Sequence, residues 1–249
     1  MLTLILAIIF GLIGSVLVNY LSDVLPFTRK LSGPVCHDCQ AGLPFGSYLL
    51  NRPCGECGAA PTLRHWVVII LGPILAVLMH QYPISNLGLW GGISWMVFFG
   101  LVVVIDLEHR LILHPVSLVG AGLGLVFGIF NHGVFNTLLG GVSGFGAMLI
   151  LYLLGNQFIK FLSKARDEEI DEVALGFGDV NLAGVMGLLL GWPGVVGGLF
   201  LAIILGGVVS GIFLMIQFIR KRYRALQALP YGPFLVLSTI ILLVLSDLN

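Results

Sequence analysis

Residues 194–218 read GVVGGLFLAIILGGVVSGIFLMIQF, a run without a single charged side chain. About 20 such residues in a helix cross the hydrocarbon core of a bilayer, so this run is long enough to span a membrane. The whole chain of 249 residues is 58% hydrophobic and only 10% charged, whereas soluble chains carry about 25% charged residues. This composition excludes a soluble enzyme and predicts an integral membrane protein.

Further apolar segments lie on both sides of this run, separated by polar breaks. The segments that we expect to be helical are 2–21, 66–80, 87–106, 116–131, 134–161, 178–191, 194–218 and 233–247. The sequence therefore predicts an all-α polytopic membrane protein with about eight transmembrane helices. We expect three parts, which are a first transmembrane helix (1–24), a loop (25–65) and a seven-helix membrane domain (66–249). Glycines four residues apart, as at Gly140 and Gly144, predict close packing between these helices.

The basic residues fall on alternate connections between the predicted helices. All twelve of them are Arg29, Lys30, Arg52, Arg64, Arg110, Lys160, Lys164, Arg166, Arg220, Lys221, Arg222 and Arg224. Because basic loops stay in the cytoplasm, this pattern predicts a cytoplasmic 25–65 loop and both termini outside. Twelve acidic residues balance the twelve basic ones, so no global basic field argues for nucleic acid as a partner.

The 25–65 loop holds all four cysteines, as Cys36-His37-Asp38-Cys39 and Cys54-Gly55-Glu56-Cys57. Two C-x-x-C pairs at this separation can wrap one tetrahedral Zn²⁺, with two thiolates from each tight turn. A structural zinc would also explain how so short a loop folds. Two alternatives stay open, namely a disulfide framework, which a reducing cytoplasm disfavours, and four free structural cysteines. His37 lies between ligands, but the four cysteines already complete a closed site.

Two aspartates follow or begin apolar helices at ends that the charge pattern places in the cytoplasm. Asp106 comes after the run Leu101–Ile105, and Asp179 lies in Gly176-Phe177-Gly178-Asp179 at the start of a helix. Ionisable groups at such depths are costly and usually face a bundle interior or a water-filled cavity. For each aspartate alone, a helix cap or an interfacial side chain is the structural alternative.

As a pair, two carboxylates a few Å apart cannot both ionise comfortably, so one keeps a proton near neutral pH. Aspartic proteases use this arrangement: the charged partner activates a water and the protonated one polarises the scissile carbonyl. Gly176 and Gly178 would let a substrate strand approach the second aspartate closely. The pattern thus predicts Asp106 and Asp179 as catalytic residues, with both glycines in an active-site loop.

The segment Gly176–Asp179 resembles the GxGD signature of intramembrane aspartyl proteases. Together with Asp106, the eight apolar segments and the four-cysteine loop, the chain resembles bacterial type IV prepilin peptidases. Further matches are Gly14-Ser15, the stretch from Asp106 to Pro115, and Pro230-Tyr231-Gly232-Pro233-Phe234. The resemblance implies an enzyme of the bacterial inner membrane that cleaves the basic leader of prepilins or pseudopilins on the cytoplasmic side.

Many members of the resembled family then N-methylate the new amino terminus, using S-adenosylmethionine. Here a glutamate often found at the start of the second helix is replaced by Ile69, the segment between the cysteine pairs is short, and Asn181 replaces a common lysine. We therefore expect methylation to be weaker than cleavage or separable from it. Two other functions remain alternatives: a proton-coupled transporter using the two aspartates, and a non-catalytic membrane scaffold that presents a zinc module.

Overall fold

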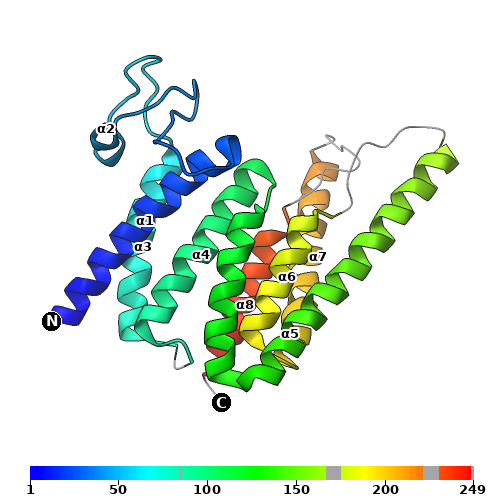
Figure 1. The fold of residues 1–249 in the computed structure, drawn as a ribbon. Helices are drawn as coiled ribbons and strands as arrows, with labels where there is room; N and C mark the ends of the chain where they lie inside the picture. Colours follow the sequence, from blue (N-terminus) through cyan, green and yellow to red (C-terminus); the bar gives the residue numbers. More distant parts are fainter. Residues whose placement is uncertain (85, 167–174, 221–229, 248–249) are drawn as a thin grey trace. The chain divides into compact units, whose positions relative to one another are not determined.

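The computed structural model describes residues 1–84, 86–166, 175–220 and 230–247 (Figure 1). In these ranges the chain is helical and contains no β-strand beyond one isolated bridge, between Val35 and Gly42. The helices are α1 (Leu2–Thr28), α2 (Phe45–Leu49), α3 (Leu63–Gln81), α4 (Gly88–His109), α5 (His114–Arg166), α6 (Phe177–Leu190), α7 (Gly194–Ile219) and α8 (Gly232–Ser246). They form two compact units, Met1–His109 and Arg110–Asn249.

Each apolar segment expected from the sequence is helical in the structure. The stretches expected at 116–131 and 134–161 form the two arms of α5, which are joined at Gly133, where the backbone leaves the helical region. By length and composition, α1, α3, α4, α5 and α7 can cross a membrane, whereas α6 and α8 are shorter apolar helices. The protein is therefore an all-helical, multi-pass membrane protein. The short helix α2, inside the cysteine loop, carries no apolar run that would have predicted it.

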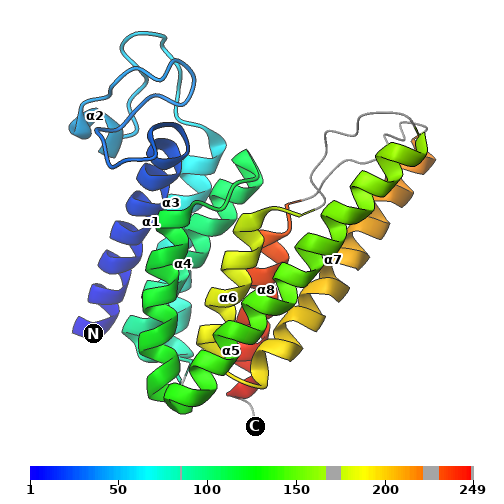
Figure 2. The same ribbon diagram turned by 45° about the vertical axis from the view of Figure 1, so that its right-hand side comes forward.

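In the first unit, α1 packs against α3 and α4. Small residues allow α1 and α3 to approach closely: a Cβ added at Gly11 would lie 2.9 Å from the carbonyl oxygen of Gly72 and 2.8 Å from Cβ of Ala76. The cysteine loop connects the end of α1 with the start of α3, and it gathers beyond that end of the helix pair (Figures 1 and 2). Since α4 runs back toward the same end, Asp106 and the loop share one end of this unit.

In the second unit, α6 packs against both arms of α5 (Figure 2). The glycines on α5 make this contact possible. A Cβ at Gly128 would lie 2.1 Å from the carbonyl oxygen of Leu188, and one at Gly144 would lie 2.4 Å from that of Ala183. The four-residue glycine spacing therefore marks helix packing here, as expected. By contrast, added Cβ atoms at Gly207 and Gly211 on α7 would meet open space.

Candidate functional site

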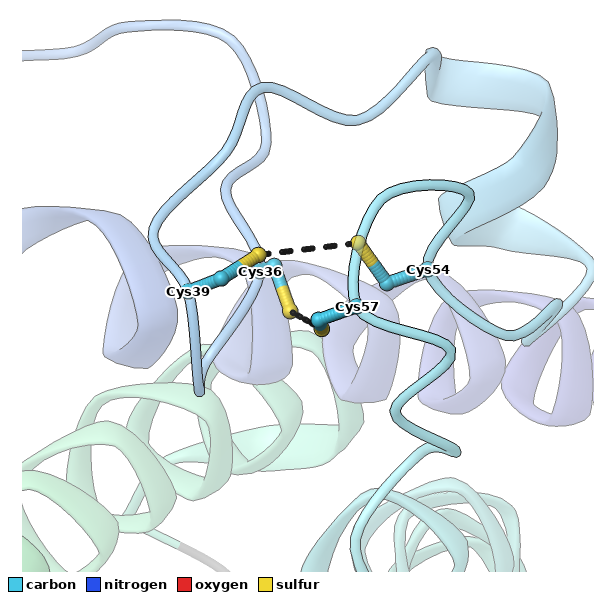
Figure 3. A group of neighbouring side chains, drawn as sticks. All are labelled: Cys36, Cys39, Cys54 and Cys57. Carbon is cyan, nitrogen blue, oxygen red and sulfur yellow. Dashed lines mark hydrogen bonds between the residues drawn. The ribbon is translucent and has the colours of Figure 1, made fainter.

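The four cysteines of the 25–65 loop come together in the structure (Figure 3). Their sulfur atoms all lie within 4.8 Å of one another. Sγ of Cys36 is 3.6 Å from Sγ of Cys57, and Sγ of Cys39 is 3.7 Å from Sγ of Cys54. The cysteines are free, with no disulfide among them.

These distances fit a tetrahedral metal site. Sulfur atoms bound to Zn²⁺ at about 2.3 Å lie about 3.8 Å apart along a tetrahedral edge. Each contact also joins one cysteine from the first C-x-x-C pair with one from the second, as a single shared ion requires. The cluster could therefore hold zinc, and the protein residues alone would complete a closed, structural site.

Both C-x-x-C turns have the same backbone hydrogen bonds. The N–H of Cys36 donates to the carbonyl of Ala41, and the N–H of Gln40 donates to the carbonyl of Cys36. Cys54 repeats the first bond with Ala59 and the second with Gly58. Gln40 and Gly58 occupy equivalent positions, and both adopt the left-handed region with φ of 57° and 71°. The loop thus consists of two matching turns that aim their sulfurs at one point.

The thiols of the cluster differ in their pKa values. N–H groups of Cys57 and, to a smaller extent, Glu56 lower the pKa of the Cys54 thiol to about 7. The pKa of Cys39 is raised to about 12 despite the N–H of Ala41, because of its hydrogen bonds with the neighbouring thiols and its burial. Because thiolates rather than thiols bind metal, zinc must displace protons from the cluster when it binds.

Asp106 lies in the last turn of α4, which ends at His109, one turn beyond the boundary that the sequence predicted. Its side chain is only 4% exposed, and Val102 and Ile105 on the same face of the helix are buried too. Leu107, on the opposite face, is exposed. A carboxyl group is thus buried at the end of an apolar helix.

Asp179 is the third residue of α6, which begins after Gly176. Its Oδ2 accepts a hydrogen bond of 3.2 Å from the N–H of Gly176, and its side chain is 8% exposed. A carboxylate in the first turn also interacts favourably with the helix dipole. Asp179 therefore makes a helix-capping contact, which is the alternative to a catalytic role for this residue.

Aromatic rings from α5 hold the first turn of α6 in place. Phe177 lies next to His114, Phe145 and Tyr152, with ring centroids 6.3, 6.3 and 5.7 Å away. Both arms of α5 contribute to this cluster, so the residue preceding Gly178 and Asp179 is fixed from two directions.

Two of the other matched motifs meet this turn within the second unit. Gly178 packs against Ile112, from the stretch after Asp106: an added Cβ would lie 2.9 Å from the Ile112 carbonyl oxygen. Tyr231, from the motif that precedes α8, lies near Asp179. Burial, and then the charge of Asp179, raises the pKa of Tyr231 to about 12.

The Ile112 contact predicts different costs for the two glycines of the motif. Alanine at Gly178 would clash with backbone atoms of residue 112, whereas a Cβ at Gly176 would meet the Asp179 carboxylate at a tolerable 3.3 Å. We expect Gly178→Ala to lower the cleavage rate of a leader peptide about 10- to 100-fold, because small displacements of reacting groups are costly. Gly176→Ala should have a smaller effect, and Gly207→Ala, in open space, should have none. Equal rates for all three variants would contradict this prediction.

The first unit also contains a buried polar cluster that the sequence patterns did not predict. Asp23, in the last part of α1, is 2% exposed and contacts Tyr48 of α2 and Arg64 and His65 of α3. The charge pattern uses Arg64 only to predict topology, yet the side chain of Arg64 is 12% exposed. One sequence signal could have indicated it, because Asp23 lies two residues beyond the expected apolar segment 2–21.

Comparisons with known proteins match the part of the chain that carries both predicted catalytic residues. The model of the type IV leader peptidase family matches residues 92–211. No solved structure matches the chain.

Three of the similar curated proteins are each named prepilin leader peptidase/N-methyltransferase. The relative from Aeromonas salmonicida is 25% identical over 209 residues, which are 82% of this chain and 66% of the relative. The relative from Legionella pneumophila is 28% identical over 227 residues, 85% of this chain and 72% of the relative. The relative from Dichelobacter nodosus is 30% identical over 200 residues, 79% of this chain and 63% of the relative.

The chain thus spans slightly less than two thirds of the length of the first and third of these relatives. The similarity to the three extends over most of this chain. Residues 92–211, with the buried Asp106 and Asp179, therefore belong to the type IV leader peptidase family.

Proposed function

We propose that this protein is an intramembrane aspartic endopeptidase that removes the leader peptide of type IV prepilins or pseudopilins at the cytoplasmic face of the bacterial inner membrane. The observation that carries the proposal is the burial of two carboxyl groups, Asp106 and Asp179, near the ends of apolar helices. Both lie in the residues that match the leader peptidase family.

In the proposed reaction, one ionised aspartate takes a proton from a water molecule as that water attacks the carbonyl carbon of the scissile peptide. The other aspartate is protonated and donates a hydrogen bond to the carbonyl oxygen. When the tetrahedral intermediate collapses, the C–N bond breaks and the leaving amine takes up a proton. The leader is released with a new carboxylate, and the mature protein has a new amino terminus.

The experiment that tests this proposal is a cleavage assay on the purified full chain with a prepilin-like peptide that carries a basic leader. Cleavage at one position that disappears in both aspartate variants would support the peptidase. If the aspartate variants kept the protein's function unchanged, the non-catalytic scaffold would be the favoured alternative. Proton-coupled uptake into proteoliposomes, without any cleavage, would favour the transporter.

The proposed cytoplasmic site makes a prediction about topology. Because basic residues mark cytoplasmic connections, reporters fused after Arg52, Lys164 and Arg222 should report the cytoplasm, and one after Asn249 should report the outside. Arg222 and Asn249 lie outside the described residues, as does the Lys164 side chain. A reversal at any of the four would break the helix count, and with it the claim that both aspartates face the cytoplasm.

We propose N-methylation of the new amino terminus as a second activity, because the three relatives carry it in their names. A small cavity of about 50 Å³ lies in the first unit between the cysteine loop and the ends of α1 and α3, and Asp38, Asn51 and Arg52 are in its lining. Pockets for cofactors of this size measure about 300 Å³ or more, so this cavity does not fit S-adenosylmethionine and we assign no residue to the cofactor there.

We expect methylation to be slower than cleavage or separable from it. The physical reason is that Ile69 places no acidic side chain on α3 where the resembled enzymes often have glutamate, while the aspartate motifs are complete. The measurement is the mass of the cleaved product's amino terminus with S-adenosylmethionine supplied. Stoichiometric methylation at the pace of cleavage would contradict the prediction.

A further inference from the structure

The buried polar cluster around Arg64 joins every helix of the first unit. Its members are Ser22 and Asp23 of α1, Tyr48 of α2, Arg64 and His65 of α3, and Glu108 of α4. Arg64 makes two ion pairs. Its guanidinium therefore joins carboxylates on two different helices.

The contacts around Asp23 are dense. Its Oδ2 accepts a hydrogen bond of 2.6 Å from the Tyr48 hydroxyl and lies 2.9 Å from Nε2 of His65. Its Oδ1 pairs with Nη2 of Arg64, whose Nη1 donates to the Ser22 hydroxyl. Burial, and then the charge of Asp23, raises the pKa of Tyr48 above its ordinary range, so this hydroxyl remains a donor.

The third nitrogen of the guanidinium forms an ion pair with a residue of α4. Nε of Arg64 lies 3.0 Å from Oε1 of Glu108, whose side chain is 26% exposed. A planar guanidinium can present Nε to one partner and both Nη atoms to another, whereas a lysine has a single nitrogen. Arg64 thus ties the last turn of α4 to the cluster around Asp23.

Glu108 lies two residues after Asp106 in that same turn. Helix ends fray unless they are held, because their final carbonyls have no partners within the helix. A partly buried ion pair at Glu108 opposes this fraying, and a carboxyl group misplaced by about 1 Å can cost around 10²-fold in rate.

We propose that Arg64 is a positioning residue for Asp106 and acts through its ion pair with Glu108. This inference rests on the proposed peptidase function. Arg64 itself touches no reacting atom, and its effect is to keep the end of α4 helical and the Asp106 carboxyl in place.

The test measures kcat and KM for a leader peptide with the full chain. Glu108→Ala removes the link and leaves the contacts of Asp23 intact, so we expect kcat to fall about 10- to 100-fold with KM changed less than about twofold. Glu108→Gln keeps the shape of the side chain but removes the charge of the ion pair, so it should lose nearly as much as Glu108→Ala. Arg64→Lys also disturbs the contacts with Asp23 and Ser22, so it should lose at least as much as Glu108→Ala. The double variant should lose no more than Arg64→Lys alone, because the link to Glu108 is already broken there. Arg29→Lys, the same substitution at an exposed arginine, is the matched control.

A second readout follows the end of α4 directly. Amide hydrogen exchange of residues 103–109 should be faster in Glu108→Ala than in the wild type, while the zinc content stays the same. If Arg64→Lys fails to fold, Glu108→Ala still tests the positioning role, since it leaves the contacts around Asp23 intact.

Different results would overturn the positioning role of Arg64 and the proposed peptidase function. Wild-type kcat in Glu108→Ala and Arg64→Lys, with Asp106→Asn inactive, would overturn the positioning role alone. An active Asp106→Asn would overturn the peptidase mechanism itself.

Discussion

Asp106→Asn and Asp179→Asn should each lower the rate of leader cleavage by about 10³-fold or more while leaving the protein folded in the membrane. Asparagine has nearly the same shape as aspartate but can neither take up a proton from water nor donate an acid proton, so the variant loses one half of the acid–base pair. Both side chains are buried, at 4% and 8% exposure, and removing a charge near the membrane does not destabilise the fold. Cleavage rates and thermal unfolding of the same preparations check both parts.

The Asp179 variant also separates catalysis from capping. Asparagine is as good as aspartate at accepting hydrogen bonds near a helix start, so Asp179→Asn keeps a partner for the N–H of Gly176. If the carboxylate served only as a cap, this variant would cleave at nearly the wild-type rate. Glutamate at either position should also fail, because its extra methylene moves the carboxyl by about 1 Å or more.

Cys54→Ser should strip the loop of metal. The purified wild type should contain about one Zn²⁺ per chain, and the variant should contain almost none, because a closed four-cysteine site loses a ligand and its tetrahedral geometry. Structural zinc contributes roughly 10 kcal/mol or more to the folding of small metal domains. The loop should therefore become sensitive to chymotrypsin at the exposed Phe45, which precedes Gly46. Slow cleavage of the leader should continue, since the aspartates lie in other segments.

His37→Ala is the matched control for this metal site. His37 directly follows Cys36, and its side chain is 39% exposed and lies 3.3 Å from Asp38. We expect this variant to retain zinc. Lowering the pH should release the metal, because protons compete with it for the thiolates. Metal analysis without zinc, together with four readily alkylated cysteines in the native protein, would contradict the zinc site.

The helices and the cysteine cluster could be predicted because each depends on local pattern. Apolar runs such as 194–218 have one stable conformation in lipid, and two C-x-x-C turns bring their thiolates to one point regardless of the rest of the fold. The kink at Gly133 also falls between two expected segments, where the apolar pattern weakens.

The cluster around Arg64 could not be predicted from those patterns. Its ion pairs join residues about 40 positions apart, from Asp23 and from Glu108 to Arg64, and only the packing of α1, α3 and α4 brings these residues together. The pattern of charges treats a basic residue in a loop as solvated. For Arg64 it therefore predicts only the side of the membrane and no buried contact. Similarly, the contact of Gly178 with Ile112 depends on how α6 meets the segment before α5.

The most direct test of the proposed mechanism is the single-turnover rate of leader cleavage in the wild type, in Asp106→Asn, in Asp179→Asn and in the double variant. Residues that act as one catalytic unit are strongly non-additive, because losing either already removes the chemistry. We predict that the double variant is no slower than either single variant, with all three at least about 10³-fold below the wild type. Near wild-type cleavage by either single variant, or losses that multiply in the double variant, would contradict an aspartate pair.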